Sequence, residues 1–185
     1  MSLGEKPWSA LANYATHSDT PRAIDARVLK RQSDSLVFQY VLRADMVGVR
    51  VPKTETPGRA DGLWKHTCFE AFVSAAGIAG YYELNFSPSR QWALYSFDGY
   101  RKGMSPVEVN SSPRIAINAH GDRLELEAEV SLLDLGLARR RLGLKLALTA
   151  VVEDDSGTLS YWALKHAPGK PDFHRPEGFV LELTL

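Results

Sequence analysis

Two neighbouring segments of the chain concentrate the side chains that could do chemistry. One carries His66 and Glu70, and the next carries Glu83 and Asn85. Carboxylate and amide groups can hydrogen-bond the hydroxyl groups of a small molecule. Aromatic residues are interleaved with these polar groups, and aromatic rings offer apolar faces on which another ring can pack. A few convergent polar groups beside rings are typical of a small-molecule site, and this mixture favours a saccharide.

Candidates for the wall and the rim of such a site lie around these segments. Trp64 and Trp162 are candidates for an aromatic wall, and His66 and Arg101 are candidates for the rim. A carboxylate that is buried beside large rings must be hydrogen-bonded or paired, because its desolvation is otherwise costly. We therefore expect Glu70 to be partly buried and to be satisfied by Arg101 or by an amide on the same face.

The spacing of the polar residues indicates two paired strands. Alternation predicts strands over Lys65–Ser74 and Tyr81–Ser87, joined by a short loop. In that hairpin Glu70 lies opposite Asn85, whose amide could then satisfy it. Glu83 is the diagonal neighbour of Glu70, at roughly 7 to 8 Å between backbone positions. The polar side chains of both strands thus converge on one face of the sheet.

The opposite faces of these strands are apolar and predict the core. A later segment shows the same period of two, because Leu124, Leu126 and Val130 alternate with glutamates. This is the pattern of a half-buried antiparallel strand with one face in water. The side chains predicted to face the core are Phe69, Ala71, Val73, Tyr82, Leu84, Phe86, Leu124, Leu126 and Val130.

Short alternating segments recur along most of the chain, and turn residues separate them. About ten short strands indicate a sandwich or a barrel rather than alternating strands and helices. Helix is scarce: Trp8–Tyr14 is a candidate short helix or loose arm, and Ser131–Leu142 has room for a turn or two. The other expected strands are Ile24–Arg31, Leu36–Ala44, Val47–Val51, Gln91–Phe97, Leu144–Glu153, Leu159–Leu164 and Phe179–Leu185, with a hairpin over Ile115–Val130.

Composition excludes several classes of partner. Basic and acidic residues balance at 22 each, whereas proteins that bind bulk nucleic acid normally show a basic excess. The short basic run Arg139–Arg141 is interpreted as a solvated turn. No segment approaches the roughly 20 apolar residues that span a bilayer, so no membrane partner is expected. Met1–Ala10 lacks the apolar run of a signal peptide and Cys68 is the single cysteine, so we expect a cytoplasmic protein.

Several motifs resemble a known family. The stretch Leu63–Phe72 resembles the W-x-x-x-x-x-E-x-F strand of DOMON-like domains and family 9 carbohydrate-binding modules. Further stretches, in the same order along the chain, resemble a bacterial DOMON-like group: Tyr82–Ser89, Trp92–Tyr95, Gly99–Met104, Ser160–Leu164 and Pro171–His174. The resemblance covers roughly residues 22–185.

This resemblance implies both a fold and a function. It implies an all-β, immunoglobulin-like or jelly-roll β-sandwich of about ten or eleven antiparallel strands over residues 22–185, with residues 1–21 as an N-terminal arm or short helix. It also implies ligand binding, to a sugar in some relatives and to haem in others. Together with the rings, carboxylates and amide, it leads us to expect a non-catalytic module that binds a carbohydrate on one sheet face.

Two alternatives differ in chemistry. Haem-binding relatives use an axial Met and His, and this chain offers Met46, Met104, His66, His166 and His174. An enzyme acting on a glycoside could use Glu70 and Glu83 as an acid/base pair, because glycosidases hold their carboxyl groups about 5 to 9.5 Å apart. The chain contains no G-x-S-x-G nucleophile motif and no glycine-rich phosphate motif.

A metal site is a third alternative. His166 and His174 flank a loop rich in Pro and Gly, with Asp172 between them, and His66 could join them in a catalytic-type zinc site. The other interpretation is structural. Asp172 and His174 could pin the loop Ala167–Glu177 by hydrogen bonds, because a long surface loop must satisfy its backbone groups.

Overall fold

The computed structural model describes residues 7–14, 20–31, 34–138 and 142–185. Within these residues the all-β prediction is confirmed, because they form thirteen strands with three short 3-10 helices and no α-helix. No helix in these ranges is long and apolar enough to cross a membrane. The elements are β1 (Ser9–Asn13), β2 (Ala23–Arg31), β3 (Ser35–Arg43), η1 (Met46–Gly48), β4 (Gly58–Arg59), η2 (Leu63–Lys65), β5 (Cys68–Ala75), β6 (Tyr81–Phe86), β7 (Gln91–Phe97), β8 (Ser105–Pro106), β9 (Arg114–Ala119), β10 (Arg123–Ser131), β11 (Gly143–Glu153), β12 (Leu159–Ala163), η3 (Pro176–Gly178) and β13 (Leu181–Thr184).

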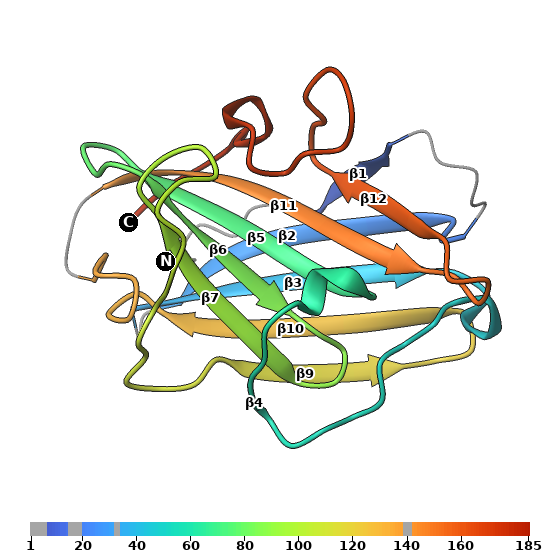
Figure 1. Cartoon of the computed structure of the whole chain (residues 1–185). Coiled ribbons are helices and arrows are strands. Elements are labelled where there is room, and N and C mark those ends of the chain that lie inside the picture. Colours follow the sequence, from blue (N-terminus) through green and yellow to red (C-terminus); the bar gives the residue numbers. More distant parts are fainter. Residues whose placement is uncertain (1–6, 15–19, 32–33, 139–141) are drawn as a thin grey trace.

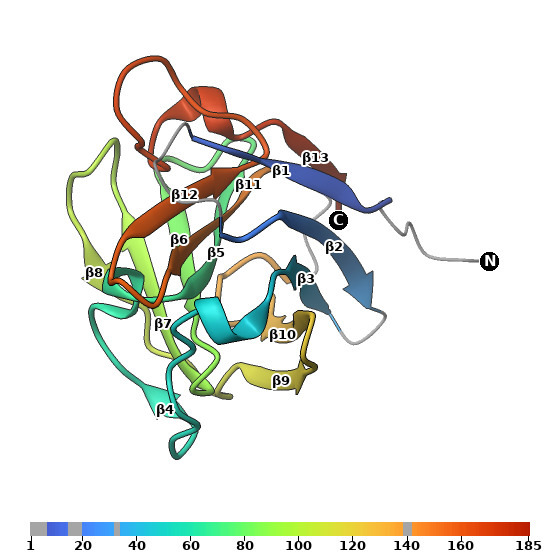
Figure 2. The ribbon, with the colours of Figure 1, turned by 90° about the vertical axis from the view of Figure 1, so that its right-hand side faces the viewer.

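The strands form one continuous, curled sheet (Figures 1 and 2). Its order is β4-β7-β6-β5-β11-β12-β1-β2-β3-β10-β9, with β13 beside β11 and β8 beside β7. Strand β1 pairs with β12 on one side and with β2 on the other, so it joins two halves of the sheet. We call β7, β6, β5, β11 and β12 the β5 half, and β2, β3, β10 and β9 the β3 half. The curl turns the two halves toward each other.

The core fills the space between the halves, and the period of two builds it. Along β10 every second side chain is buried, as the alternation predicts. Aromatic pairs connect the halves: the ring centroids of Phe38 and Phe86 lie 5.7 Å apart, and those of Tyr40 and Phe69 lie 5.0 Å apart. The predicted core is confirmed, since all nine side chains belong to this cluster or, for Tyr82, pack against it.

The N-terminal segment differs from the expected arm or short helix. Residues 9–13 form strand β1, in which Ala12 pairs with Ala163 and Leu11 pairs with Ile24. Leu11 is the one buried side chain of this strand. A single buried position gives no detectable alternation, which is why the sequence did not reveal the strand.

Two further expectations are corrected by local turn chemistry. Val47–Val51 is not a strand, because the Asp45 side chain accepts a hydrogen bond from the backbone N–H of Val47 and caps η1. The described part of Ser131–Leu142 forms turns rather than helix, with the hydroxyl oxygen of Ser131 accepting from the backbone N–H of Leu133. The basic run Arg139–Arg141 lies outside the described residues.

Strand β5 begins three residues later than the alternation predicts. Gly62 has a φ of 74°, a conformation that glycine adopts without steric cost, and the chain then turns through Leu63–Lys65. Pairing starts at Cys68. Trp64 and His66 therefore lie on the turn that precedes the strand, which frees them from its strict alternation.

The fold leads to a test of the core assignment. Phe69 is fully buried, and Phe69→Ala is expected to lower the free energy of unfolding by about 3 to 5 kcal/mol, as truncation of a large core side chain does. Urea denaturation measures this change. Val47→Ala is the control, because Val47 is 88% exposed and such a change costs less than about 0.5 kcal/mol. A loss below about 1 kcal/mol for Phe69→Ala would mean that the two faces of β5 are assigned the wrong way round.

Candidate functional site

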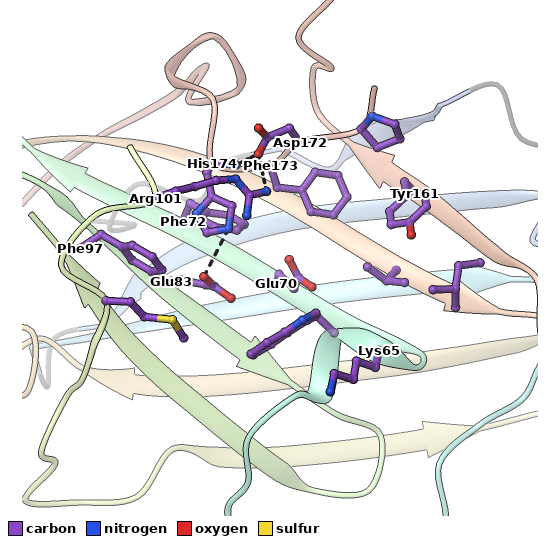
Figure 3. A pocket seen from close by; sticks show the side chains of 15 residues that line it. Lys65, Glu70, Phe72, Glu83, Phe97, Arg101, Tyr161, Asp172, Phe173 and His174 are labelled. Atoms are coloured by element: carbon purple, nitrogen blue, oxygen red, sulfur yellow. Dashed lines mark hydrogen bonds and ion pairs between the residues drawn. The ribbon is translucent and has the colours of Figure 1, made fainter. Parts of the chain in front are cut away.

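A pocket of about 540 Å³ opens on the outer face of the β5 half. Its floor is the sheet, and its walls are η2, the loop after β7 and the loop that follows β12 (Figure 3). This volume is typical of a site for a small molecule. The pocket is lined by Trp64, Lys65, Glu70, Phe72, Glu83, Phe97, Arg101, Met104, Val151, Leu159, Tyr161, Pro171, Asp172, Phe173 and His174.

Strand register places the polar groups on the floor. Glu70 pairs with Asn85, and Phe72 pairs with Glu83, as the predicted hairpin requires. On the other side of β5, Thr149 of β11 lies opposite Glu70. Because these positions share one face, the two glutamates point to the same side of the sheet as the ring of Phe72.

Asp172 holds the two wall loops together. Its carboxylate accepts from the guanidinium of Arg101 at 2.8 Å, from the hydroxyl of Tyr100 at 2.5 Å and from the backbone N–H of His174 at 3.2 Å. These donors outweigh the burial of Asp172 and hold the pKa of its carboxyl below the ordinary value. The interpretation of Asp172 as the residue that pins this loop agrees with these contacts.

Tyr81 and Glu83 flank the two ring nitrogens of His174. The hydroxyl of Tyr81 accepts from the backbone N–H of Arg101 at 3.2 Å and lies 2.8 Å from Nδ1 of His174. If the hydroxyl donates its own proton to Nδ1, the ring carries its hydrogen on Nε2, which lies 3.7 Å from an oxygen of Glu83. Burial, with the nearby Arg101 cation, lowers the pKa of His174 to about 4, although Asp172 acts in the opposite direction. The ring is therefore neutral near pH 7.

The two glutamates have different partners. Glu83 accepts a hydrogen bond of 2.8 Å from the amide of Asn85. Burial raises the pKa of the Glu83 carboxyl, and the Asn85 hydrogen bond and the Arg101 cation oppose that rise.

Glu70 is the least satisfied polar group of the floor. It is 3% exposed, and its Oε1 atom has no hydrogen-bond partner among the described residues. Burial, followed by repulsion from Glu83, raises its pKa well above 4.5. The hydroxyl of Thr149 lowers that pKa in part, but it too lacks a hydrogen bond of regular geometry.

The structure brings most of the predicted site residues together. Trp64, Glu70, Glu83 and Arg101 line the pocket, and Asn85 lies fully buried beside Glu83. The expected partners of Glu70 were wrong, however. Arg101 binds Asp172 across the wall loops, and the amide of Asn85 binds Glu83.

Two predicted site residues lie elsewhere. Trp162 is 5% exposed within the main core, and its indole N–H donates to the hydroxyl of Ser160. The neighbouring Tyr161 points into the pocket instead, so the aromatic residue was assigned to the wrong face of β12. His66 does not line the pocket, because its Nδ1 atom lies 2.7 Å from a carboxylate oxygen of Glu153.

The histidines named for a metal site are not gathered into a cluster. His166 contacts the backbone oxygen of Ala12 through Nε2 at 2.8 Å, whereas His174 lies in the pocket and His66 pairs with Glu153. Among the residues that the structure describes, no three His, Cys, Asp or Glu side chains are placed to share a metal ion.

Sequence reasoning assigned no pocket role to Tyr161, Phe97, Phe173 or His174. The alternation of β12 and of β7 contains the signal for Tyr161 and Phe97, because each lies on the outer face of its strand. Phe173 and His174 belong to a loop without periodicity. The sequence singled out this loop only through the resemblance of its Pro-Asp-Phe-His motif to a bacterial DOMON-like group.

Comparison with known proteins identifies the fold. No protein-family model and no curated protein matches the sequence. A solved structure of a candidate carbohydrate-binding protein from Bacteroides uniformis superposes with a TM-score of 0.71 at 14% identity, over 96% of this chain and 85% of that one.

Family 9 carbohydrate-binding modules from Caldicellulosiruptor kristjanssonii have the same fold. The structure with cellotriose gives a TM-score of 0.59 at 9% identity, over 96% of this chain and 81% of that one. The structure with glucose gives 0.51 at 9% identity, over 88% and 76%. The chain therefore shares the fold of family 9 modules, as the resemblance implied.

The raised pKa of Glu70 makes stability depend on pH. The folded chain holds the Glu70 proton more tightly than the unfolded chain, so protonation of Glu70 stabilises the folded state. This contribution to the free energy of unfolding is complete below about pH 4.5 and is lost as the pH rises through the folded pKa. Glu70→Gln cannot lose a proton. The variant should therefore gain stability relative to the wild type as the pH rises, which thermal unfolding at about pH 4, 6 and 8 measures.

Glu125→Gln is the matched control for this pH series. Glu125 lies on β10, and its hydrogen bond from Arg123 lowers its pKa, so this variant should gain no stability as the pH rises. A constant difference between Glu70→Gln and the wild type across the series would contradict the assignment of a raised pKa to Glu70.

Proposed function

We propose that this chain is a non-catalytic module that binds a saccharide in the pocket of the β5 half. The observation that carries the proposal is Glu70, a buried carboxyl group with an unpartnered oxygen on the floor of a pocket bordered by rings. A sugar hydroxyl both donates and accepts hydrogen bonds, so it can pair with a carboxyl group in either protonation state. The carbohydrate ligands named for the proteins of the same fold support this proposal.

The aromatic borders of the pocket suit the apolar C–H faces of a sugar ring. Trp64 is held by an edge-to-face contact with Tyr95 at 6.1 Å between ring centroids. Tyr161 and Phe173 form a second edge-to-face pair at 6.2 Å. Rings fixed in this way offer apolar surface against which the C–H groups of a pyranose can pack without further ordering of the protein.

The carboxyl pair fits binding better than glycoside hydrolysis. Hydrolysis needs one carboxyl group that stays ionised as a nucleophile or base beside one that is protonated. Here burial raises the pKa values of both Glu70 and Glu83, although the Asn85 amide and the Arg101 cation oppose the rise at Glu83. Neither carboxyl group has the lowered pKa that a nucleophile or base requires. We therefore do not favour the enzyme alternative.

The arrangement of His174 argues against the haem alternative. Met104 and His174 both line the pocket, but each ring nitrogen of His174 already faces an oxygen, of Tyr81 or of Glu83. The likeness of fold to family 9 modules supports our finer interpretation of the curled sheet as an immunoglobulin-like or jelly-roll β-sandwich, with the β5 and β3 halves as its two layers.

Saccharide binding is tested by isothermal titration with glucose and cellotriose. Glu70→Gln keeps the shape of the side chain and is expected to weaken binding by about 1 to 3 kcal/mol, the scale of a hydrogen bond to a charged group. Trp64→Ala should also weaken binding, because it removes a packing surface. The controls are Glu125→Gln and Trp8→Ala, which alter a carboxylate and a ring on the β3 half.

Two results would count against the proposal. Equal affinity in the wild type, Glu70→Gln and Trp64→Ala would place the saccharide elsewhere on the molecule. The absence of any saccharide that raises the melting temperature of the wild type would argue against saccharide binding itself, since a ligand of the folded state stabilises it.

The haem alternative has its own spectroscopic test. The protein should remain without a Soret band when haem is added, because Nδ1 of His174 is hydrogen-bonded to Tyr81 and Nε2 faces Glu83. Absorbance titration measures this. A saturable Soret shift that His174→Ala or Met104→Ala abolishes would reverse our ranking of the two ligands.

A further inference from the structure

A second pocket lies on the outer face of the β3 half and has a volume of about 320 Å³. The core separates it from the pocket that contains Glu70, because the two halves of the sheet turn their inner faces toward each other (Figure 2). Its volume lies at the lower end of the range that is usual for ligand sites. We call it the Arg27 pocket. The side chains that could bind a ligand there are Trp8, Arg27, Gln39, Asn118, Glu125 and Glu127.

One row of paired residues crosses the floor of the Arg27 pocket. Arg27 of β2 lies opposite Gln39 of β3, and Gln39 lies opposite Glu127 of β10. Nε of Arg27 donates to the side-chain oxygen of Gln39 at 2.6 Å. The side-chain nitrogen of Gln39 donates in turn to Oε2 of Glu127 at 2.6 Å. Gln39 is thus bonded on both sides, and it fixes the Nε end of the guanidinium.

The ring of Trp8 covers one face of the same guanidinium. Cζ of Arg27 lies 4.5 Å from the centroid of the Trp8 ring, which is the distance of a cation–π contact. Trp8 directly precedes β1 and is 43% exposed. Because Gln39 and Trp8 together hold the guanidinium in one orientation, a ligand that binds it has little ordering of the protein to overcome.

Arg27 differs from the other arginines of this sheet face in its charge partners. Each acidic side chain on the outer face of the β3 half is paired with another arginine. The pairs are Asp25 with Arg43, Glu125 with Arg123, Glu127 with Arg31, and Glu129 with Arg31 and Arg114. Within residues 7–14, 20–31, 34–138 and 142–185, Arg27 has no carboxylate partner, and its Nη1 and Nη2 atoms make no hydrogen bond.

We propose that the Arg27 pocket binds the carboxylate group of a small hydroxy acid. The Nη1 and Nη2 atoms of a guanidinium form a planar fork that matches the two oxygens of a carboxylate. Asn118 and Glu125 line the same pocket, and their side-chain oxygens can accept hydrogen bonds from the hydroxyl groups of the ligand. This site is separate from the saccharide pocket and does not depend on the proposed function.

The acidic neighbours of Arg27 favour a carboxylate over a more highly charged anion. Glu125 and Glu127 line the pocket, and although each is paired with its own arginine, both repel a dianion more strongly than a monoanion. A phosphate ester group carries about 1.5 to 2 negative charges at pH 7, whereas a carboxylate carries one. A neutral ligand, in contrast, leaves the Arg27 cation without a counter-charge.

Isothermal titration with D-glucuronate, D-gluconate and L-lactate tests the site. Arg27→Gln should weaken the binding of these hydroxy acids at least about tenfold, the scale of a hydrogen bond to a charged group. Arg27→Lys keeps the charge but replaces the planar fork with a single ammonium group, so its affinity should lie between those of the wild type and Arg27→Gln. Circular dichroism checks that both variants fold.

Matched controls separate the carboxylate and the pocket from other effects. D-glucuronamide has nearly the shape of D-glucuronate without its charge, and it should bind the wild type and Arg27→Gln equally. Arg22→Gln removes an exposed arginine that does not line the pocket, and it should leave the affinity for D-glucuronate within about twofold. Glu70→Gln should leave that affinity unchanged as well, because Glu70 lies on the other half of the sheet.

Four results would overturn this inference. They are equal binding of the hydroxy acids by the wild type and Arg27→Gln, a loss of D-glucuronate binding in Glu70→Gln instead, binding of inorganic phosphate as tight as that of D-glucuronate, and no binding of any of the three hydroxy acids by the wild type. None of them bears on the saccharide pocket, which the titrations with glucose and cellotriose test independently.

Discussion

The register of β5 between β6 and β11 is the constraint on which the rest of the structure depends. Side chains alternate along a strand, so the eight residues of β5 supply both Phe69 for the core and Glu70 for the pocket floor. A slip of one residue would exchange the two faces and place a carboxylate among the apolar side chains. The desolvation cost of that carboxylate opposes the slip. Core and floor are therefore specified by the same pairing.

The walls of the pocket depend on a different kind of interaction. Asp172 gathers donors from two loops that are distant in sequence, Arg101 and Tyr100 from one and the backbone of His174 from the other. These contacts bind the loops to each other rather than to the floor. Glu70 on the floor takes part in none of these contacts, and its Oε1 atom stays available to a ligand.

Periodic features of the site could be predicted from sequence, and features made by loops could not. The pairing of Glu70 with Asn85 followed from alternation and a short loop. Trp162 was misplaced because adjacent aromatic residues on β12 occupy opposite faces, and residue type alone does not say which one faces out. The partners of Arg101 and His174 depend on how loops fold back over the sheet, and no local pattern encodes such contacts. Strand β1 was not predicted, because its residues show no alternation and it is a strand through its pairing with β2 and β12.

That short strand has a consequence for the integrity of the whole sheet. Strand β1 is held by three residue pairs with β2 and two with β12, yet it is the element that makes the two halves continuous. Without it, the backbones of β2 and β12 would each present unpaired N–H and C=O groups, and exposed strand edges are templates for the pairing of separate chains. By pairing with both strands, the residues around Leu11 cover these two edges. Strand β1 therefore opposes self-association of the protein through its sheet edges.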